Sequence, residues 1–120
     1  MPPEALRGEC RDHKALDVFS FGVLLNEIAS GKRPWAEVPE GPGKMFAIQK
    51  LVATHEKRPQ LAHNITLEFR RLIEECWDTH PARRLVFDGP RGIVSRLGAI
   101  KDYVLENPRE TPGQNQSAHA

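Results

Sequence analysis

The sequence is short of several features that define whole classes of protein. Only two cysteines, Cys10 and Cys76, occur in 120 residues, which argues against a disulfide framework and fits a reducing compartment. Seventeen Lys and Arg residues nearly balance sixteen Asp and Glu residues, so the charge does not favour nucleic-acid binding. No apolar run approaches the roughly 20 residues that span a bilayer, and the N-terminus lacks the apolar stretch of a secretory signal. We therefore expect a cytoplasmic protein that binds neither nucleic acid nor a membrane.

The sequence also lacks a recognisable catalytic or metal-binding motif. The five histidines are scattered, and the Cys10–His13 spacing has no matching second pair, which a structural zinc site would need. Residues 41–44 read Gly-Pro-Gly-Lys, but Pro42 removes an N–H group that a bound phosphate would need, and no strand precedes the turn. The residues alone thus predict no catalytic residue, no cofactor-binding residue and no metal ligand in this chain.

The hydrophobic periodicity predicts an all-α fold. Residues 16–30 place apolar side chains almost all round a helical wheel, which is typical of a helix buried in a core. Gly31 stands where a C-cap glycine is expected, and Pro34 prevents the helix from continuing. Three further segments show amphipathic helical spacing: residues 44–55, 66–77 and 93–104.

The chain is long enough for one domain. Loops rich in proline and glycine connect the four predicted helices. Residues 107–120 contain no large apolar side chain and are expected to form a disordered tail. The predicted organisation is a domain over residues 1–106 followed by this tail.

Four segments in order resemble the C-terminal part of the large lobe of a eukaryotic protein kinase: MPPEAL (1–6), LDVFSFGVLLNEIASGKRPW (16–35), KRPQL (57–61) and LIEECWDTHPARRLVF (72–87). The resemblance covers roughly residues 1–105 and is closest to the tyrosine-kinase-like and tyrosine kinase branches. Four motifs in register are a far more specific signal than one. The resemblance implies a partial kinase C-lobe, with a central buried helix, three to four surrounding helices and proline-rich loops.

The resemblance also implies structural roles for four residues. Glu4, at the end of the activation segment, would form a buried ion pair with Arg84, although both could instead be exposed surface charges. Asp17 would accept hydrogen bonds from the backbone of the catalytic loop, or act locally as a helix N-cap. Trp77 would be a core aromatic residue. In the family, the helix over residues 44–55 often docks other proteins.

On the helix over residues 44–55, the candidate docking residues are Met45, Ile48 and Leu51. The sequence departs from the family pattern at four positions: Pro2 for alanine, Phe19 for Trp or Tyr, His80 for a common aspartate and Leu85 for proline. These departures weaken the motifs without erasing them.

The parts of a kinase that bind ATP and Mg²⁺ would lie upstream of the sequence, which begins at the methionine before the Pro-Glu motif. Phosphoryl transfer depends on those parts, so we expect these 120 residues alone to be non-catalytic. The first interpretation is therefore a fragment of a kinase that phosphorylates protein Ser/Thr or Tyr, with serine/threonine favoured over tyrosine. This fragment would supply the helical platform on the side of a protein substrate.

The second interpretation is a short kinase-like binding module that docks on a partner protein, and the third is a remnant without function. Without the upstream elements, one side of the helix over residues 16–30 would be left uncovered. This apolar surface would favour self-association or binding to a partner.

Overall fold

The computed structural model describes residues 2–8 and 12–107. In these residues the elements are helices, without strands: α1 (Pro3–Leu6), α2 (His13–Ser30), α3 (Lys44–His55), α4 (Leu67–Cys76), the 3-10 helix η1 (Pro81–Arg83) and α5 (Ile93–Glu106). The predicted all-α fold is confirmed. Apart from Asn107, the predicted tail over residues 107–120 lies outside the described residues.

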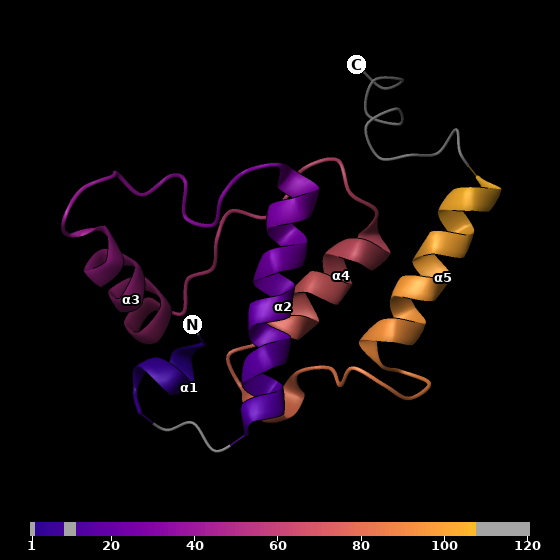
Figure 1. The fold of residues 1–120 in the computed structure, drawn as a ribbon, viewed down its shortest axis with the longest axis horizontal. Coiled ribbons are helices and arrows are strands. Elements are labelled where there is room, and N and C mark those ends of the chain that lie inside the picture. Colours follow the sequence, from indigo (N-terminus) through magenta and orange to yellow (C-terminus); the bar gives the residue numbers. More distant parts are fainter. Residues whose placement is uncertain (1, 9–11, 108–120) are drawn as a thin grey trace.

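Helix α2 is the central element of the fold (Figure 1). It begins three residues earlier than the periodicity predicted, because the Asp12 carboxylate accepts hydrogen bonds from the backbone N–H groups of Lys14 and Ala15, at 3.0 and 3.2 Å. Such a side-chain cap satisfies donors that have no partner within the helix. At the other end Gly31 adopts φ 70° and donates to the Glu27 carbonyl, which confirms the predicted C-cap.

Helix α4 packs directly against α2 (Figure 1). The Thr66 hydroxyl caps α4 by accepting a hydrogen bond from Phe69 N at 3.2 Å. The two helices approach so closely at Gly22 that a Cβ atom there would lie 2.6 Å from Cys76 Cβ. Gly22 is therefore required by the packing of α2 on α4.

Helices α3 and α5 lie on opposite sides of the central α2–α4 pair (Figure 1). Helix α5 packs against α4, and the short helix α1 packs against α3. The core is formed where α2, α3, α4 and α5 turn their apolar side chains inward. Its buried residues are Val18, Phe19, Leu25, Val52, Leu72, Ile73, Cys76, Trp77 and Ile93.

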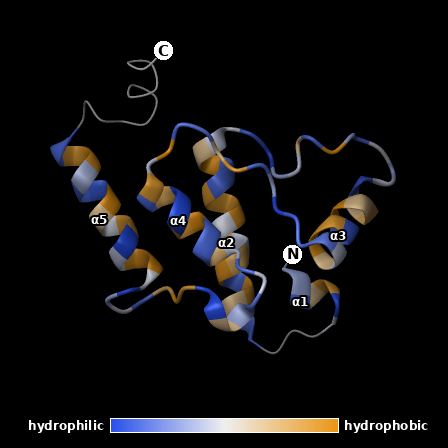
Figure 2. Ribbon diagram, turned by 180° about the vertical axis from the view of Figure 1, so that it is seen from behind, coloured by the Kyte–Doolittle hydropathy of each residue, from blue (hydrophilic) through white to orange (hydrophobic). Residues whose placement is uncertain are grey.

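The described molecule is thin, with principal extents of 44 × 36 × 17 Å. A layer of this thickness leaves part of α2 uncovered, and Figure 2 shows hydrophobic residues along the length of this helix. Leu24 and Ile28 are 47% and 68% exposed. Together with the exposed Asp17 and Ser20, they follow the 3.6-residue period and mark one face of the helix.

Candidate functional site

The structure brings Glu4 and Arg84 together across 80 residues of sequence. Arg84 Nη1 and Nη2 donate to the two carboxylate oxygens of Glu4 at 2.6 and 2.8 Å. The Arg84 side chain is 0% exposed and the Glu4 side chain is 6% exposed. This is a buried, two-pronged ion pair of the kind that combines charge with a fixed geometry.

Arg84 also connects α1 to two other parts of the chain. Its Nε donates to the Asp78 carbonyl at 2.8 Å, and its Nη1 donates to the Ala15 carbonyl at 3.0 Å. Burial by itself would raise the pKa of Glu4, but the hydrogen bond and the charge of Arg84 outweigh it, so the pKa lies below its usual value. The carboxylate is therefore held in its charged form and fastens α1 to α2 and to the loop after α4.

A second arginine, Arg58, lies in the same cluster. Its Nε donates to the Trp77 carbonyl and its Nη2 to the Thr79 hydroxyl, both at 2.8 Å. The guanidinium carbons of Arg58 and Arg84 lie 5.0 and 4.9 Å from the centre of the Phe19 ring, within reach of a cation–π attraction. Burial and the neighbouring Arg84 charge lower the pKa of Arg58. Phe19 thus has two cationic partners, Arg58 and Arg84.

Asp17 lies inside α2 and is exposed. The prediction that it caps this helix is wrong, because Asp12 is the N-cap and the helix begins at His13. The proposed partner of Asp17, the backbone of a catalytic loop, is not part of this sequence. Its role as an anchor stays a prediction.

Trp77 ends α4 as its C-cap and is 6% exposed, within the core. The adjacent Cys76 is fully buried, and this burial raises the pKa of its thiol to about 12. A thiol that stays protonated at neutral pH is a poor nucleophile. Both residues therefore contribute packing rather than chemistry.

The three candidate docking residues of α3 differ in exposure. Met45 is 67% exposed, whereas Ile48 and Leu51 are half-buried. The sequence did not single out Phe46, which is 73% exposed. Met45 and Ile48 line an apolar cavity of about 280 Å³ between α1, α2 and α3. Helix α3 thus has both an exposed apolar end and an apolar hollow beside it.

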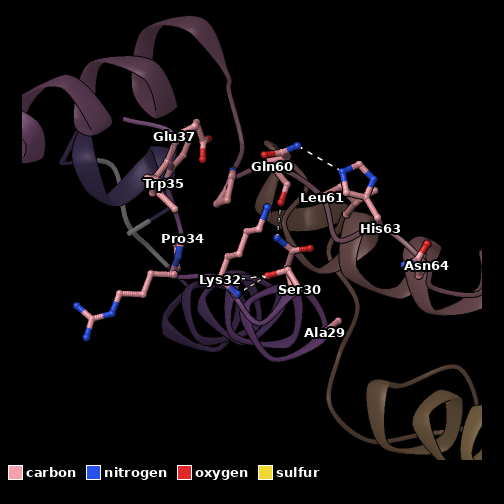
Figure 3. A pocket seen from close by; sticks show the side chains of 14 residues that line it. Ala29, Ser30, Lys32, Pro34, Trp35, Glu37, Gln60, Leu61, His63 and Asn64 are labelled. Atoms are coloured by element: carbon pink, nitrogen blue, oxygen red, sulfur yellow. Dashed lines mark hydrogen bonds between the residues drawn. The ribbon is translucent and has the colours of Figure 1, made fainter. Parts of the chain in front are cut away.

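A larger cleft of about 660 Å³ lies between the C-terminal end of α2 and the loop segment 59–64 (Figure 3). The buried Asn26 holds the two together: its Nδ2 donates to the Gln60 carbonyl at 2.9 Å, and its Oδ1 accepts from Ala62 N at 2.7 Å. Sequence reasoning missed this clamp. The signal was present, since Asn26 interrupts the apolar run of the central helix.

Residues 2–8 and 12–107 contain no group of three or more His, Cys, Asp or Glu side chains that could hold a metal ion. Of the helices described, none is long and apolar enough to cross a membrane.

Residues 1–93 match the family described as protein tyrosine and serine/threonine kinase. This chain belongs to that family. The kinase match ends at the first residue of α5, which continues the fold to Glu106.

Several curated kinases are similar to the chain. It is 38% identical over 98 residues to the probable serine/threonine-protein kinase drkC of Dictyostelium discoideum, covering 82% of this chain and 12% of that protein. It is 35% identical over 103 residues to the dual specificity protein kinase zak2 of the same organism, covering 85% and 15%. It is 34% identical over 105 residues to human mitogen-activated protein kinase kinase kinase 10, covering 88% and 10%. The chain therefore spans only a small part of each of these kinases.

Proposed function

We propose that these 120 residues are the substrate-side helical platform of a protein kinase domain with serine/threonine specificity. The parent reaction is transfer of the ATP γ-phosphate to a protein hydroxyl. In this proposal the platform holds the end of the activation segment and presents a surface to the protein substrate. Relatives named as serine/threonine and dual-specificity kinases support this reading.

The observation that carries the proposal is the buried ion pair of Glu4 and Arg84. A charged pair taken out of water contributes stability only when its geometry is good and its remaining hydrogen bonds are satisfied. Here the pair is two-pronged and Arg84 has two further carbonyl partners. The pair therefore fixes α1, the segment that the resemblance places at the end of the activation segment, against the helical core.

The groups that handle ATP and Mg²⁺ are proposed to belong to another part of the kinase. Mg²⁺ needs oxygen ligands in a nearly octahedral arrangement, supplied by carboxylates and by the substrate phosphates. The described residues assemble no such set, and Glu4 is already engaged by Arg84. The proposal assigns no catalytic step to a residue of this chain.

Phosphate transfer by the endogenous protein tests the proposal. An antibody raised against residues 107–120 captures the protein from its source cells, and labelled ATP with a general protein substrate reports transfer to Ser, Thr or Tyr. We expect labelled phosphoserine or phosphothreonine with the captured protein and none with the recombinant 120-residue chain. Capture of a protein that transfers no phosphate would contradict the proposal.

A second candidate function is a non-catalytic binding module that docks on a protein partner. It is favoured by the exposed Met45 and Phe46 of α3, since exposed apolar residues that cluster often mark contact sites. The capture experiment separates the two functions. A captured 13.5 kDa chain with a stoichiometric partner protein and no transfer activity would favour the module.

A further inference from the structure

The larger cleft has walls from three separate parts of the chain. Ala29 and Ser30 come from the end of α2, Trp35 comes from the following loop, and Leu61 comes from the loop segment 59–64. Neither the Glu4–Arg84 pair nor Asp17 lines it. The cleft is therefore separate from the residues on which the proposed kinase function rests.

Lys32 gives the cleft a positively charged side chain. Figure 3 shows its side chain extending toward Gln60, from the loop that follows α2. Among the described residues, no carboxylate forms an ion pair with Lys32. Arg33 and His63 also line the cleft, and the carboxylate among its lining residues is that of Glu37. The charge of the cleft thus favours an anionic ligand.

Trp35 gives the cleft an apolar wall in a fixed position. Its backbone has φ 62°, a left-handed conformation that bulky residues adopt rarely and that surrounding contacts must maintain. Trp35, Pro34 and Pro59 line both this cleft and the apolar cavity under α3. The two hollows are therefore neighbours that share one rigid wall.

The segment 59–64 adds a backbone that can pair with another chain. Within the described residues, its backbone groups form no hydrogen bonds with other backbone groups; Asn26 engages only the Gln60 carbonyl and the Ala62 N–H. The segment bends at His63 and Asn64, so the backbone that remains free to pair with a peptide is that of Leu61, between Gln60 and Ala62. A single small anion would pair with Lys32 but would contact neither the backbone of this segment nor the indole of Trp35.

We propose that the cleft binds an acidic peptide segment of a partner protein. A carboxylate of that segment pairs with Lys32, and an apolar side chain next to it packs against Trp35. The charge of the cleft, the shared apolar wall and the volume of about 660 Å³ together select a peptide that carries both kinds of side chain.

The probe is a fluorescein-labelled peptide, Gly-Leu-Glu-Glu-Leu-Glu-Gly, whose binding to the full 120-residue chain is followed by fluorescence polarisation. The matched peptide has Gln in place of each Glu. We expect the acidic peptide to bind with an affinity that falls as salt is raised, and the Gln peptide to bind at least about tenfold more weakly, because the charge pair is lost.

Two variants locate the binding. Lys32→Glu reverses the charge in the cleft and is expected to weaken binding of the acidic peptide by about tenfold or more. Lys101→Glu makes the same change on the exposed surface of α5, outside the cleft, and is expected to leave binding within about twofold. Circular dichroism verifies that both variants keep the helical fold.

Three outcomes of the same experiment would overturn the proposal. Failure of the acidic peptide to bind, equal binding of the Gln peptide, or equal losses in Lys32→Glu and Lys101→Glu would each show that the cleft is not an acidic-peptide site. The experiment uses no ATP, so its failure leaves the proposed kinase function untouched.

Discussion

At the scale of single residues, the cluster around Phe19 contains more positive than negative charge. Two guanidinium groups, those of Arg58 and Arg84, flank the ring, while Glu4 supplies the carboxylate that pairs with Arg84. The Ala15 carbonyl oxygen accepts a further hydrogen bond from Arg84, and the Trp77 carbonyl oxygen accepts one from Arg58. The cluster is stable only while Glu4 stays charged and in place, because a buried cation without its partner is strongly unfavourable.

Substitution of Glu4 by alanine is the first prediction at this scale. Glu4→Ala leaves Arg84 buried without its countercharge and should lower the free energy of unfolding by about 3–5 kcal/mol. Arg70→Ala is the matched control, since it breaks the exposed Arg70–Glu74 pair, which contributes only about 0–1 kcal/mol. Urea denaturation followed by circular dichroism measures both, and equal losses in the two variants would contradict the assigned role of the buried pair.

The second prediction concerns pH. The pKa of Glu4 is lower in the folded protein than its ordinary value of 4.5, so the unfolded state binds more protons and stability rises with pH in this range. The contribution of the pair is complete above the unfolded pKa and is lost as pH falls through the folded pKa.

Urea midpoints measured from neutral pH down to about pH 3 should therefore fall less steeply in Glu4→Gln than in the wild-type chain. Glu40→Gln serves as the control, because the Glu40 side chain, which pairs with Lys44, is exposed. A Glu4→Gln profile that parallels the wild-type profile would count against the pair as the source of acid sensitivity.

Sequence reasoning at the residue scale reached Glu4, Arg84 and Trp77 through the family resemblance rather than through local pattern. Nothing in the spacing of two charges 80 residues apart indicates that they meet. Arg58 and Asn26 were missed because their partners are mainly backbone carbonyl and N–H groups, and any residue supplies these. The path of the loops, which the sequence does not show, decides such contacts.

At the scale of elements, the close contact of α2 and α4 depends on Gly22. The third prediction is that Gly22→Ala costs about 1–3 kcal/mol in unfolding free energy, because the new methyl group would overlap with Cys76 and force the helices apart. Gly98→Ala provides the comparison. A Cβ atom at Gly98 in α5 meets nothing within 4 Å, and the better helix former should add about 0.5–1 kcal/mol.

Thermal unfolding of the two glycine variants compares them directly. Gly22→Ala should melt below the wild-type chain and Gly98→Ala above it. A Gly22→Ala variant as stable as the wild type would show that α2 and α4 do not pack as described.

The four longer helices were predictable because their apolar residues repeat with the helical period. The short elements α1 and η1 were not, since four and three residues are too few to establish a period. The start of α2 was placed too late for a related reason. Its first two residues, His13 and Lys14, are polar, and Asp12 rather than an apolar residue determines where the helix begins.

At the scale of the whole molecule, the thin layer leaves apolar residues of α2 in contact with water. Leu24 and Ile28 lie on the exposed face of a helix whose opposite face packs on α4. In the proposed kinase, other parts of the domain cover this face. The isolated chain is therefore expected to bind apolar dyes or to self-associate.

The fourth prediction follows from this exposure. Leu24→Gln combined with Ile28→Lys should reduce dye binding and self-association while changing the unfolding free energy by only about 0.5 kcal/mol per site, as surface substitutions do. Val18→Gln is the contrasting variant, because Val18 is 1% exposed and a buried polar group should increase dye binding. Sedimentation and dye fluorescence measure both, and a wild-type chain that is monomeric without dye binding would contradict the expectation.

The central claim is that these 120 residues work as part of a larger kinase. The most direct measurement is the intact mass of the endogenous protein, captured with an antibody against residues 107–120. A mass of kinase-domain size or larger is the result that this account predicts. A single species of 13.5 kDa would contradict it and would make the search for a binding partner the next step.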